Sequence, residues 1–418
     1  MMVTSLHPLL SRKAAITVFL AFASAYFLSA LIRAITATLS PTLTQELGLT
    51  ARDLGLLAGG YFLGFSLTQL PLGSWLDRFG PKRVNIAFLS VAVLGCLAFA
   101  TASSFAGLLL ARMLCGVGVS ACLMAPLTGY RRWLTPAAQL RTNSWMLMTG
   151  SLGMLTSTLP VQWLMPWMGW RVMFLVLAVM VALTMLLMAW QVPAWEVPSE
   201  DAQAQTPATE KGYAAVWRSR YFWRMTPIGF FSYGGMVAIQ TLWAGPWLTQ
   251  VGGWSSMEAA TGLFIINLTM LCVFWTWGLV TPKLSRRGIH PNKLIAWGLP
   301  ASFGVMGLLI VAAEGLGAST AGVLALFCLT SSFVSLAQPA VGQAFPAALA
   351  GRALSAYNLV IFSGIFVVQW GIGLTVDLFK SWGWATVAAF QGAMTVFLIC
   401  SMAAYAYFLW SKPDNSTP

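Results

Sequence analysis

The chain has 418 residues, of which 58% are hydrophobic and only 8% are charged, and its formal net charge is +12. A soluble domain carries about 25% charged residues, so this composition leaves too few to cover a water-facing surface. The composition excludes a soluble globular protein. It predicts an all-α membrane protein, because a spanning helix needs about 20 apolar residues and the chain holds twelve such segments.

The first six predicted spans are 14–38, 54–76, 84–102, 105–127, 143–163 and 170–190. The first run is too long for the apolar core of a signal peptide and predicts an uncleaved span. The polar stretch 191–224 is rich in Pro, Gln, Ala and acidic residues, which is typical of a solvated linker. The last six predicted spans are 225–250, 257–281, 294–313, 320–345, 354–376 and 384–410. The expected organisation is therefore an N-terminal six-helix bundle (1–190), a linker (191–224) and a C-terminal six-helix bundle (225–418).

The basic residues lie almost entirely on alternate connections. Of 23 Lys and Arg residues, 18 fall on one predicted side with both termini and the linker, 3 fall on the opposite side, and 2 lie inside spans. Positive charge accumulates in cytoplasmic loops, so both termini and the linker are predicted to be cytoplasmic. This topology signal also accounts for the basic excess, and we expect no nucleic-acid partner.

The six cysteines lie in apolar stretches without a CxxC spacing and indicate neither disulfides nor metal ligands. We expect no metal and no cofactor.

The two halves of the sequence repeat a local pattern. Arg141 lies twelve residues before Gly153, and Arg352 lies twelve residues before Gly364. Two parallel six-helix repeats with a binding site near the membrane midplane are a known plan of transporters.

Two motifs carry a family resemblance. The second span runs into a loop that reads Gly73-Ser-Trp-Leu-Asp77-Arg78-Phe-Gly80-Pro-Lys82-Arg83, and the fourth contains Arg112-Met-Leu-Cys-Gly116-Val-Gly118. The first resembles the signature loop Gly-x-x-x-Asp-Arg/Lys-x-Gly-x-Arg/Lys of the major facilitator superfamily, and the second resembles its Arg-x-x-x-Gly-x-Gly segment. The resemblance implies twelve helices in two pseudo-symmetric six-helix bundles that expose a central site to each side in turn.

The signature loop supplies candidate gating residues. Gly73 is expected to let two helices approach closely. Asp77 is expected to cap a neighbouring helix and to pair with Arg78 or Arg83. The resemblance implies that such contacts latch one gating state. The alternative is that the cations of this loop only mark its cytoplasmic side.

Two arginines lie inside predicted spans, where a charge is costly and is usually paired or faces an aqueous cavity. Arg33, in the first span, either attracts an anionic substrate or extends to the outer interface. For Arg112 the resemblance implies a part in coupling or gating, and the alternative is pairing with backbone carbonyls. No acidic residue lies deep in a predicted span, which argues against exchange of a cationic drug for protons.

Neutral polar side chains at depth complete the candidates, because such groups need partners in lipid. They bind substrate across the centre, or they pair with neighbouring helices. The substrate-binding candidates are Tyr233, Gln240, Asn267 and Asn358, with Gln69, Gln338 and Gln369 as further polar positions.

The pattern predicts a secondary-active transporter in a bacterial inner membrane, monomeric and in contact with lipids. Its expected substrate is a small organic or inorganic anion, carried with protons or by exchange. The Gly-Pro-rich segment of the fifth span, common in exporters of the family, is only partly present at 150–160, which favours uptake. The alternative is an efflux pump for amphipathic compounds. A sensor or a membrane enzyme fits less well, since no catalytic cluster is expected at depth.

Overall fold

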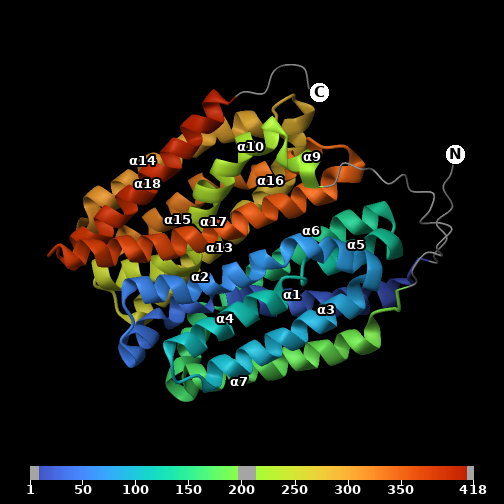
Figure 1. Cartoon of the computed structure of the whole chain (residues 1–418), viewed down its shortest axis with the longest axis horizontal. Coiled ribbons are helices and arrows are strands. Elements are labelled where there is room, and N and C mark those ends of the chain that lie inside the picture. The colour runs from blue at the N-terminus through green and yellow to red at the C-terminus, as the bar shows by residue number, and fades with distance from the viewer. Residues whose placement is uncertain (1–8, 196–212, 412–418) are drawn as a thin grey trace.

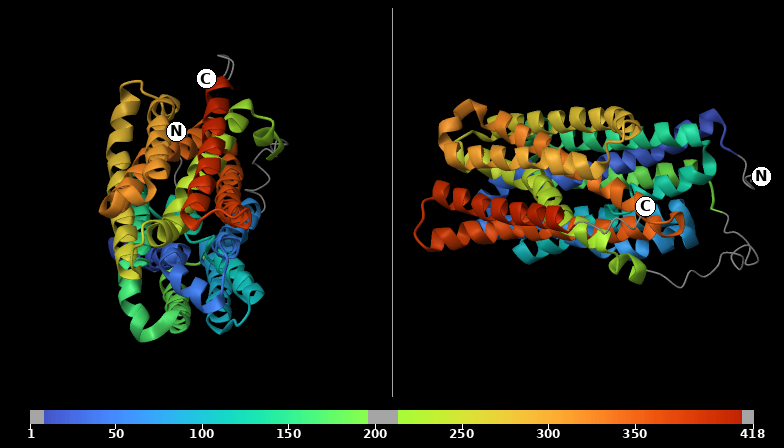
Figure 2. Two further views of the ribbon diagram at one scale, coloured as in Figure 1. Left: turned by 90° about the vertical axis from the view of Figure 1, so that its left-hand side faces the viewer. Right: turned by 90° about the horizontal axis from the view of Figure 1, so that it is seen from above.

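The computed structural model describes residues 9–195 and 213–411, and these residues are helical with no β-strand. The helices of the first half, α1 to α7, form the lower part of the bundle in Figure 1, and those of the second half, α10 to α18, form the upper part. Figure 2 shows the same helices running along the long axis of the molecule. The predicted all-α membrane fold is confirmed.

The first half makes six crossings. Two of them end at glycines with positive φ, Gly80 (φ 77°) and Gly169 (φ 65°), where the chain turns without interrupting the helical run on either side. The elements are α1 (Arg12–Leu47), α2 (Ala51–Leu67), α3 (Gln69–Thr101), α4 (Phe105–Val119), α5 (Met124–Trp133), α6 (Pro136–Thr156) and α7 (Leu159–Gln191).

The second half repeats the arrangement with more irregular helices. Its first crossing alternates α-helical and π-helical turns, and such widened turns are frequent at functional sites. The elements are α9 (Tyr213–Trp217), α10 (Arg220–Pro227), η1 (Ile228–Tyr233), α11 (Gly234–Ala238), η2 (Ile239–Trp243), α12 (Ala244–Pro246), η3 (Trp247–Val251), α13 (Ser256–Arg286), α14 (Pro291–Ala312), η4 (Ala313–Ser319), α15 (Thr320–Ser331), η5 (Ser332–Leu336), α16 (Ala337–Gln343), α17 (Ala347–Ser381) and α18 (Thr386–Trp410).

Eight described helical stretches are long and apolar enough to cross a membrane. Some of these units contain two predicted spans, as in 291–343. Other predicted spans fall below the length limit because their helices are broken, as α2 is from α3 at Thr68. The twelve predicted segments therefore correspond to helical crossings, although several are not continuous helices.

Glycines of the fourth crossing bring helices into backbone contact, as small residues do in membranes. A Cβ atom added to Gly116 would lie 1.9 Å from the carbonyl oxygen of Tyr61, and one added to Gly118 would lie 2.1 Å from the amide nitrogen of Ala92. The expectation for Gly73 is wrong in this structure, because a Cβ there would meet nothing within 4 Å. Gly73 lies near the end of its crossing, where no neighbouring backbone comes close enough to need a glycine.

Replacing Gly116 with alanine should destabilise the protein, since the added methyl group meets the backbone of α2. Overpacking costs about 1–3 kcal/mol, so we expect the apparent melting temperature in detergent to fall by several degrees. The matched control is Gly278→Ala in α13, where nothing lies within 4 Å. There only the higher helix propensity of alanine acts, which should leave stability equal or raised. A Gly116→Ala variant as stable as this control would contradict the packing.

Candidate substrate-binding site and gates

Arg33 lies on α1 and turns into the bundle. Its electrostatic neighbours are the phenol groups of Tyr26, Tyr61 and Tyr233, which come from α1, α2 and η1. Arg33, Tyr26 and Tyr233 each keep some exposed surface, whereas Tyr61 is fully buried. The Nε atom of Arg33 is buried and has no hydrogen-bond partner among the described residues. Arg33 and Tyr233, proposed separately from the sequence, are thus brought together across the two halves of the chain.

Arg112 lies on α4 and is fully buried. Its Nη1 atom donates a hydrogen bond of 2.9 Å to the carbonyl oxygen of Ile32, the residue before Arg33. Its guanidinium carbon lies 5.2 Å from the ring centre of Tyr61, which is a cation–π distance. Its Nε and Nη2 atoms have no hydrogen-bond partner within residues 9–195 and 213–411. The contact with a backbone carbonyl matches the structural alternative for this residue, and its position ties it to the backbone that carries Arg33.

Neither guanidinium has a carboxylate counter-ion in the described part of the chain. In that part of the chain, ion pairs join Arg52 to Asp53 and Arg171 to Glu46, both near helix ends. A buried charge without a partner is costly in a low-dielectric interior. The region around Arg33 and Tyr61 therefore carries uncompensated positive potential, which favours the binding of an anion.

The polar candidates of the second half pair with one another. Gln240 donates from Nε2 to Oδ1 of Asn267 over 3.0 Å, and Asn267 donates to the carbonyl oxygen of Leu263 over 2.9 Å. Gln369 donates to the hydroxyl of Thr241 over 3.0 Å. These bonds follow the helix-pairing alternative. Tyr233 and Gln240 both lie on π-helical turns of the seventh crossing.

A second group of amides joins the halves. Asn358 on α17 donates to Oε1 of Gln69 on α3 over 3.4 Å and accepts from Gln338 on α16 over 2.5 Å. Beside it, the rings of Phe65 and Phe362 lie 4.1 Å apart. Asn358 is therefore part of the seam between the halves, and the structure does not place it with Gln240 and Asn267.

Towards the predicted outer end, α2 and α17 meet backbone to backbone. A Cβ at Gly55 would lie 2.5 Å from the carbonyl oxygen of Gln369, and one at Gly373 would lie 2.3 Å from that of Ala51. The two carboxylate oxygens of Asp377 accept from the amide nitrogens of Ala51 (3.2 Å) and Arg52 (2.8 Å). A carboxylate at a helix N-terminus is stabilised by the amide groups and the helix dipole. Asp377 thus fastens the second half to the first residues of α2.

The sequence analysis assigned no role to Asp377, which directly follows the predicted span 354–376. An acid at the end of a span and a Thr50-x-x-Asp53 capping pattern at the start of another are visible in the sequence. Nothing in a single sequence shows that the two ends touch.

The loop between the second and third crossings differs from expectation. Asp77 shows no ion pair within the described residues, and the cations that act on it are Arg132, Arg131 and Arg352 rather than Arg78 or Arg83. The reason is geometric, because consecutive helical residues point in different directions. The Arg78 guanidinium instead lies 5.2 Å from the ring centre of Phe79. The carboxylate that caps a helix of the other half is instead Asp377, which lies at the other end of the bundle and caps α2.

A bundle of twelve helical crossings with a polar, cationic centre between two halves defines a membrane transport protein. The sequence matches the family model of the Major Facilitator Superfamily over residues 22–369. The chain belongs to this superfamily, and it is a secondary transporter of a small molecule and not an enzyme.

The relatives of the chain include named transporters. A probable sulfoacetate transporter, SauU of Cupriavidus necator, is 25% identical over 350 residues, which cover 78% of each chain. The niacin transporter NiaP of Acinetobacter baylyi is 27% identical over 151 residues, covering 36% of this chain and 34% of NiaP. A probable L-galactonate transporter of Escherichia coli is 27% identical over 144 residues, covering 33% and 31%.

Solved structures share the fold. The crystal structure of a D-xylose-proton symporter superposes with a TM-score of 0.76 at 14% identity, covering 97% of this chain and 99% of that one. A bacterial homologue of the human lysosomal transporter Spinster, in an inward-facing and unoccupied conformation, gives a TM-score of 0.74 at 15% identity and covers 96% and 97%.

Replacing Asp377 with asparagine should loosen the contact between α17 and the start of α2. The variant loses a charge-assisted acceptor, and hydrogen bonds to charged groups contribute about 1.5–3 kcal/mol. In a background whose six cysteines are replaced by alanine, Ser40→Cys reports access between the halves on the same predicted side, since Ser40 of α1 is buried against Gly245 of α12. We expect an impermeant thiol reagent to label this cysteine about tenfold faster in Asp377→Asn, which corresponds to about 1.4 kcal/mol.

The control is Asp53→Asn, because Asp53 bonds to Thr50 within its own helix end and not across the halves. Equal labelling rates in both variants would show that Asp377 does not hold the seam.

Proposed function

We propose that the protein carries a small organic anion across a bacterial cytoplasmic membrane and that Arg33 binds the charge of this cargo. The observation that carries the proposal is the environment of Arg33. Its guanidinium has three phenol groups as electrostatic neighbours, the residue is half-buried, and no carboxylate pairs with it in the described residues. A purely structural arginine at this depth would be paired with an acid or held by a backbone carbonyl, as Arg112 is.

The phenols suit such a cargo. A guanidinium binds a carboxylate or sulfonate through two parallel N–H···O bonds. The hydroxyls of Tyr26 and Tyr233 are available to donate further bonds from α1 and η1, since both residues are partly exposed beside Arg33. An anion at this place would contact both halves of the chain at once, as a cargo must if it is to bias their relative position.

The relatives support the same class of cargo. The three relatives are named for sulfoacetate, niacin and L-galactonate. All three compounds are small organic acids that are anionic at neutral pH. The relative that aligns over most of the chain is named for sulfoacetate, which carries both a sulfonate and a carboxylate. We therefore take sulfoacetate as the first compound to test and uptake as the direction.

Alternating access would follow from the contacts between residues 1–190 and 225–418. The seam at Ala51, Gly373 and Asp377 supports a state closed on the predicted outer side. We infer that this seam opens while the cations around Asp77, among them Arg352 of the second half, close the opposite side. Arg112 would transmit the change, because it holds the carbonyl before Arg33. Proton symport needs no carboxylate at depth if the cargo itself carries the proton, and exchange needs none either.

Replacing Arg33 with glutamine should abolish anion transport while the protein still folds. We expect uptake of labelled sulfoacetate into proteoliposomes to fall at least tenfold, since a charge-assisted bidentate bond is lost. The matched control is Lys380→Gln, which removes a cation near the predicted outer surface, and it should transport as the wild type does. L-galactonate, niacin and neutral galactose extend the test to other cargo. Unchanged anion uptake by Arg33→Gln would refute the charge-binding role.

A further inference from the structure

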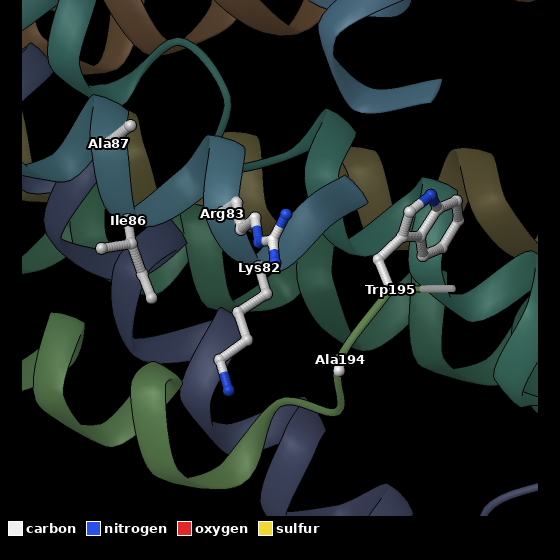
Figure 3. Close-up of a pocket in the computed structure, with 6 residues that line it drawn as sticks. All are labelled: Lys82, Arg83, Ile86, Ala87, Ala194 and Trp195. Atoms are coloured by element: carbon white, nitrogen blue, oxygen red, sulfur yellow. The ribbon is translucent and has the colours of Figure 1, made fainter. Parts of the chain in front are cut away.

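A cavity of about 410 Å³ lies at the predicted cytoplasmic end, between the start of the third crossing and the segment that follows α7. Figure 3 shows its walls, with Lys82, Arg83, Ile86 and Ala87 on one side and Ala194 and Trp195 on the other. It is separate from the region around Arg33, which lies inside the bundle. Two cations and an otherwise apolar lining make it suited to a ligand with an anionic group and an apolar part.

No ion pair neutralises the two cations within the described part of the chain. Neither Lys82 nor Arg83 forms an ion pair or side-chain hydrogen bond with another residue of the described ranges 9–195 and 213–411. Both follow Gly80 and Pro81 directly, at the start of the helical segment of the third crossing. The amide ends of a helix add positive potential there, so the electrostatic energy of this wall falls when an anion approaches.

Trp195 fixes the opposite wall. Its ring lies against Gly80, where an added Cβ would come within 2.2 Å of the indole. Its Nε1 atom donates to the carbonyl oxygen of Asp77 over 3.4 Å. The Arg132 guanidinium carbon lies 3.8 Å from its ring centre, and the ring of Trp133 packs against it edge-on at 6.2 Å. These four contacts hold the segment after α7 in place, so the cavity is a built feature of the fold.

The cavity continues into a surface that faces lipid. On α3, the residues Arg83, Ala87, Ser90, Leu94 and Leu97 follow one another at helical spacings of three and four, and all are exposed. Leu183 and Leu186 on the adjoining α7 are exposed as well, and Trp190 near its end is 79% exposed. Such a stripe on the outside of a membrane bundle contacts acyl chains, and an exposed Trp near a span end marks the headgroup level. An occupant with a chain could therefore lie along α3 below the two cations.

We propose that this cavity binds the phosphate of an anionic phospholipid, with Lys82 and Arg83 on the phosphate and the acyl chains along Ala87, Leu94 and Leu97. A free phosphate group is the other source of the same chemistry. The apolar lining and the exposed stripe favour the lipid, because a free anion would use neither. The lipid would touch the segment that carries Trp195, and through it the backbone of Asp77.

The test uses the full-length protein, delipidated in detergent, and titrates it with phosphatidylglycerol or with zwitterionic phosphatidylcholine. Native mass spectrometry counts the bound lipid. We expect the wild type to retain phosphatidylglycerol in preference to phosphatidylcholine. Each cation near a membrane surface contributes about fivefold to anionic lipid binding, so the double variant Lys82→Gln/Arg83→Gln should bind phosphatidylglycerol about thirtyfold more weakly. Arg286→Gln/Arg287→Gln, which removes two exposed cations of another loop on the same predicted side, should bind as the wild type does.

A cavity-filling variant separates the two sources of phosphate. Ala87→Phe keeps both cations and occupies the apolar part, so it should lose phosphatidylglycerol while remaining folded by size-exclusion chromatography. If inorganic phosphate displaces phosphatidylglycerol from the wild type and Ala87→Phe binds both as before, the ligand is a soluble anion and the lipid proposal fails.

Wild-type retention of phosphatidylglycerol by Lys82→Gln/Arg83→Gln would also overturn the proposal.

Discussion

A positive charge without a counter-ion inside the membrane is the constraint that organises the centre of this protein. Placing an arginine at the middle of a spanning helix costs about 2.5–3.5 kcal/mol even by the most lenient measure, and Arg33 and Arg112 are both present without an acid beside them in the described residues. The fold accommodates the two arginines in different ways. Arg112 is sealed against a carbonyl and a ring, whereas Arg33 keeps open surface among phenols. Only the second solution leaves a group free to take a partner that comes and goes.

The contacts between the halves show how such a partner could be released. They are short backbone approaches at glycines, a carboxylate on two amide groups, a few amide pairs and ring contacts such as that of Phe65 with Phe362. Contacts of this kind form or separate as units, since a helix either lies against its neighbour or does not. Within the first half, Gly116 and Gly118 set α4 directly against the backbones of α2 and α3, and the proposed alternating access needs these helices to move as one body. Rigid halves and a separable seam are what rocking requires.

The sequence predicted the helical crossings, since a spanning length of apolar residues leaves few alternatives. It also identified Arg33, Tyr233 and Arg112 as unusual, because polar groups at depth stand out in an apolar chain. It failed where the answer depends on the rotation of one helix against another. Gly73 and Gly116 both belong to the family motifs, yet only Gly116 has another atom within 4 Å of an added Cβ. The partners of Asp77 and the role of Asp377 depend on residues tens or hundreds of positions away, which a single sequence does not pair.

The signature loop gains a meaning that its motif alone does not give. Gly80 is needed twice, for its positive φ and for the indole of Trp195 that lies where a side chain would be. The position of Trp195, in the segment after the sixth crossing, therefore depends on the conformation of the loop before the third crossing. Lys82 and Arg83 lie beside this contact, at the predicted level of the lipid headgroups. A ligand that neutralises them would act on the same few residues that bring Asp77 towards Arg352. On the lipid proposal, the composition of the membrane acts on the proposed inner gate through Trp195.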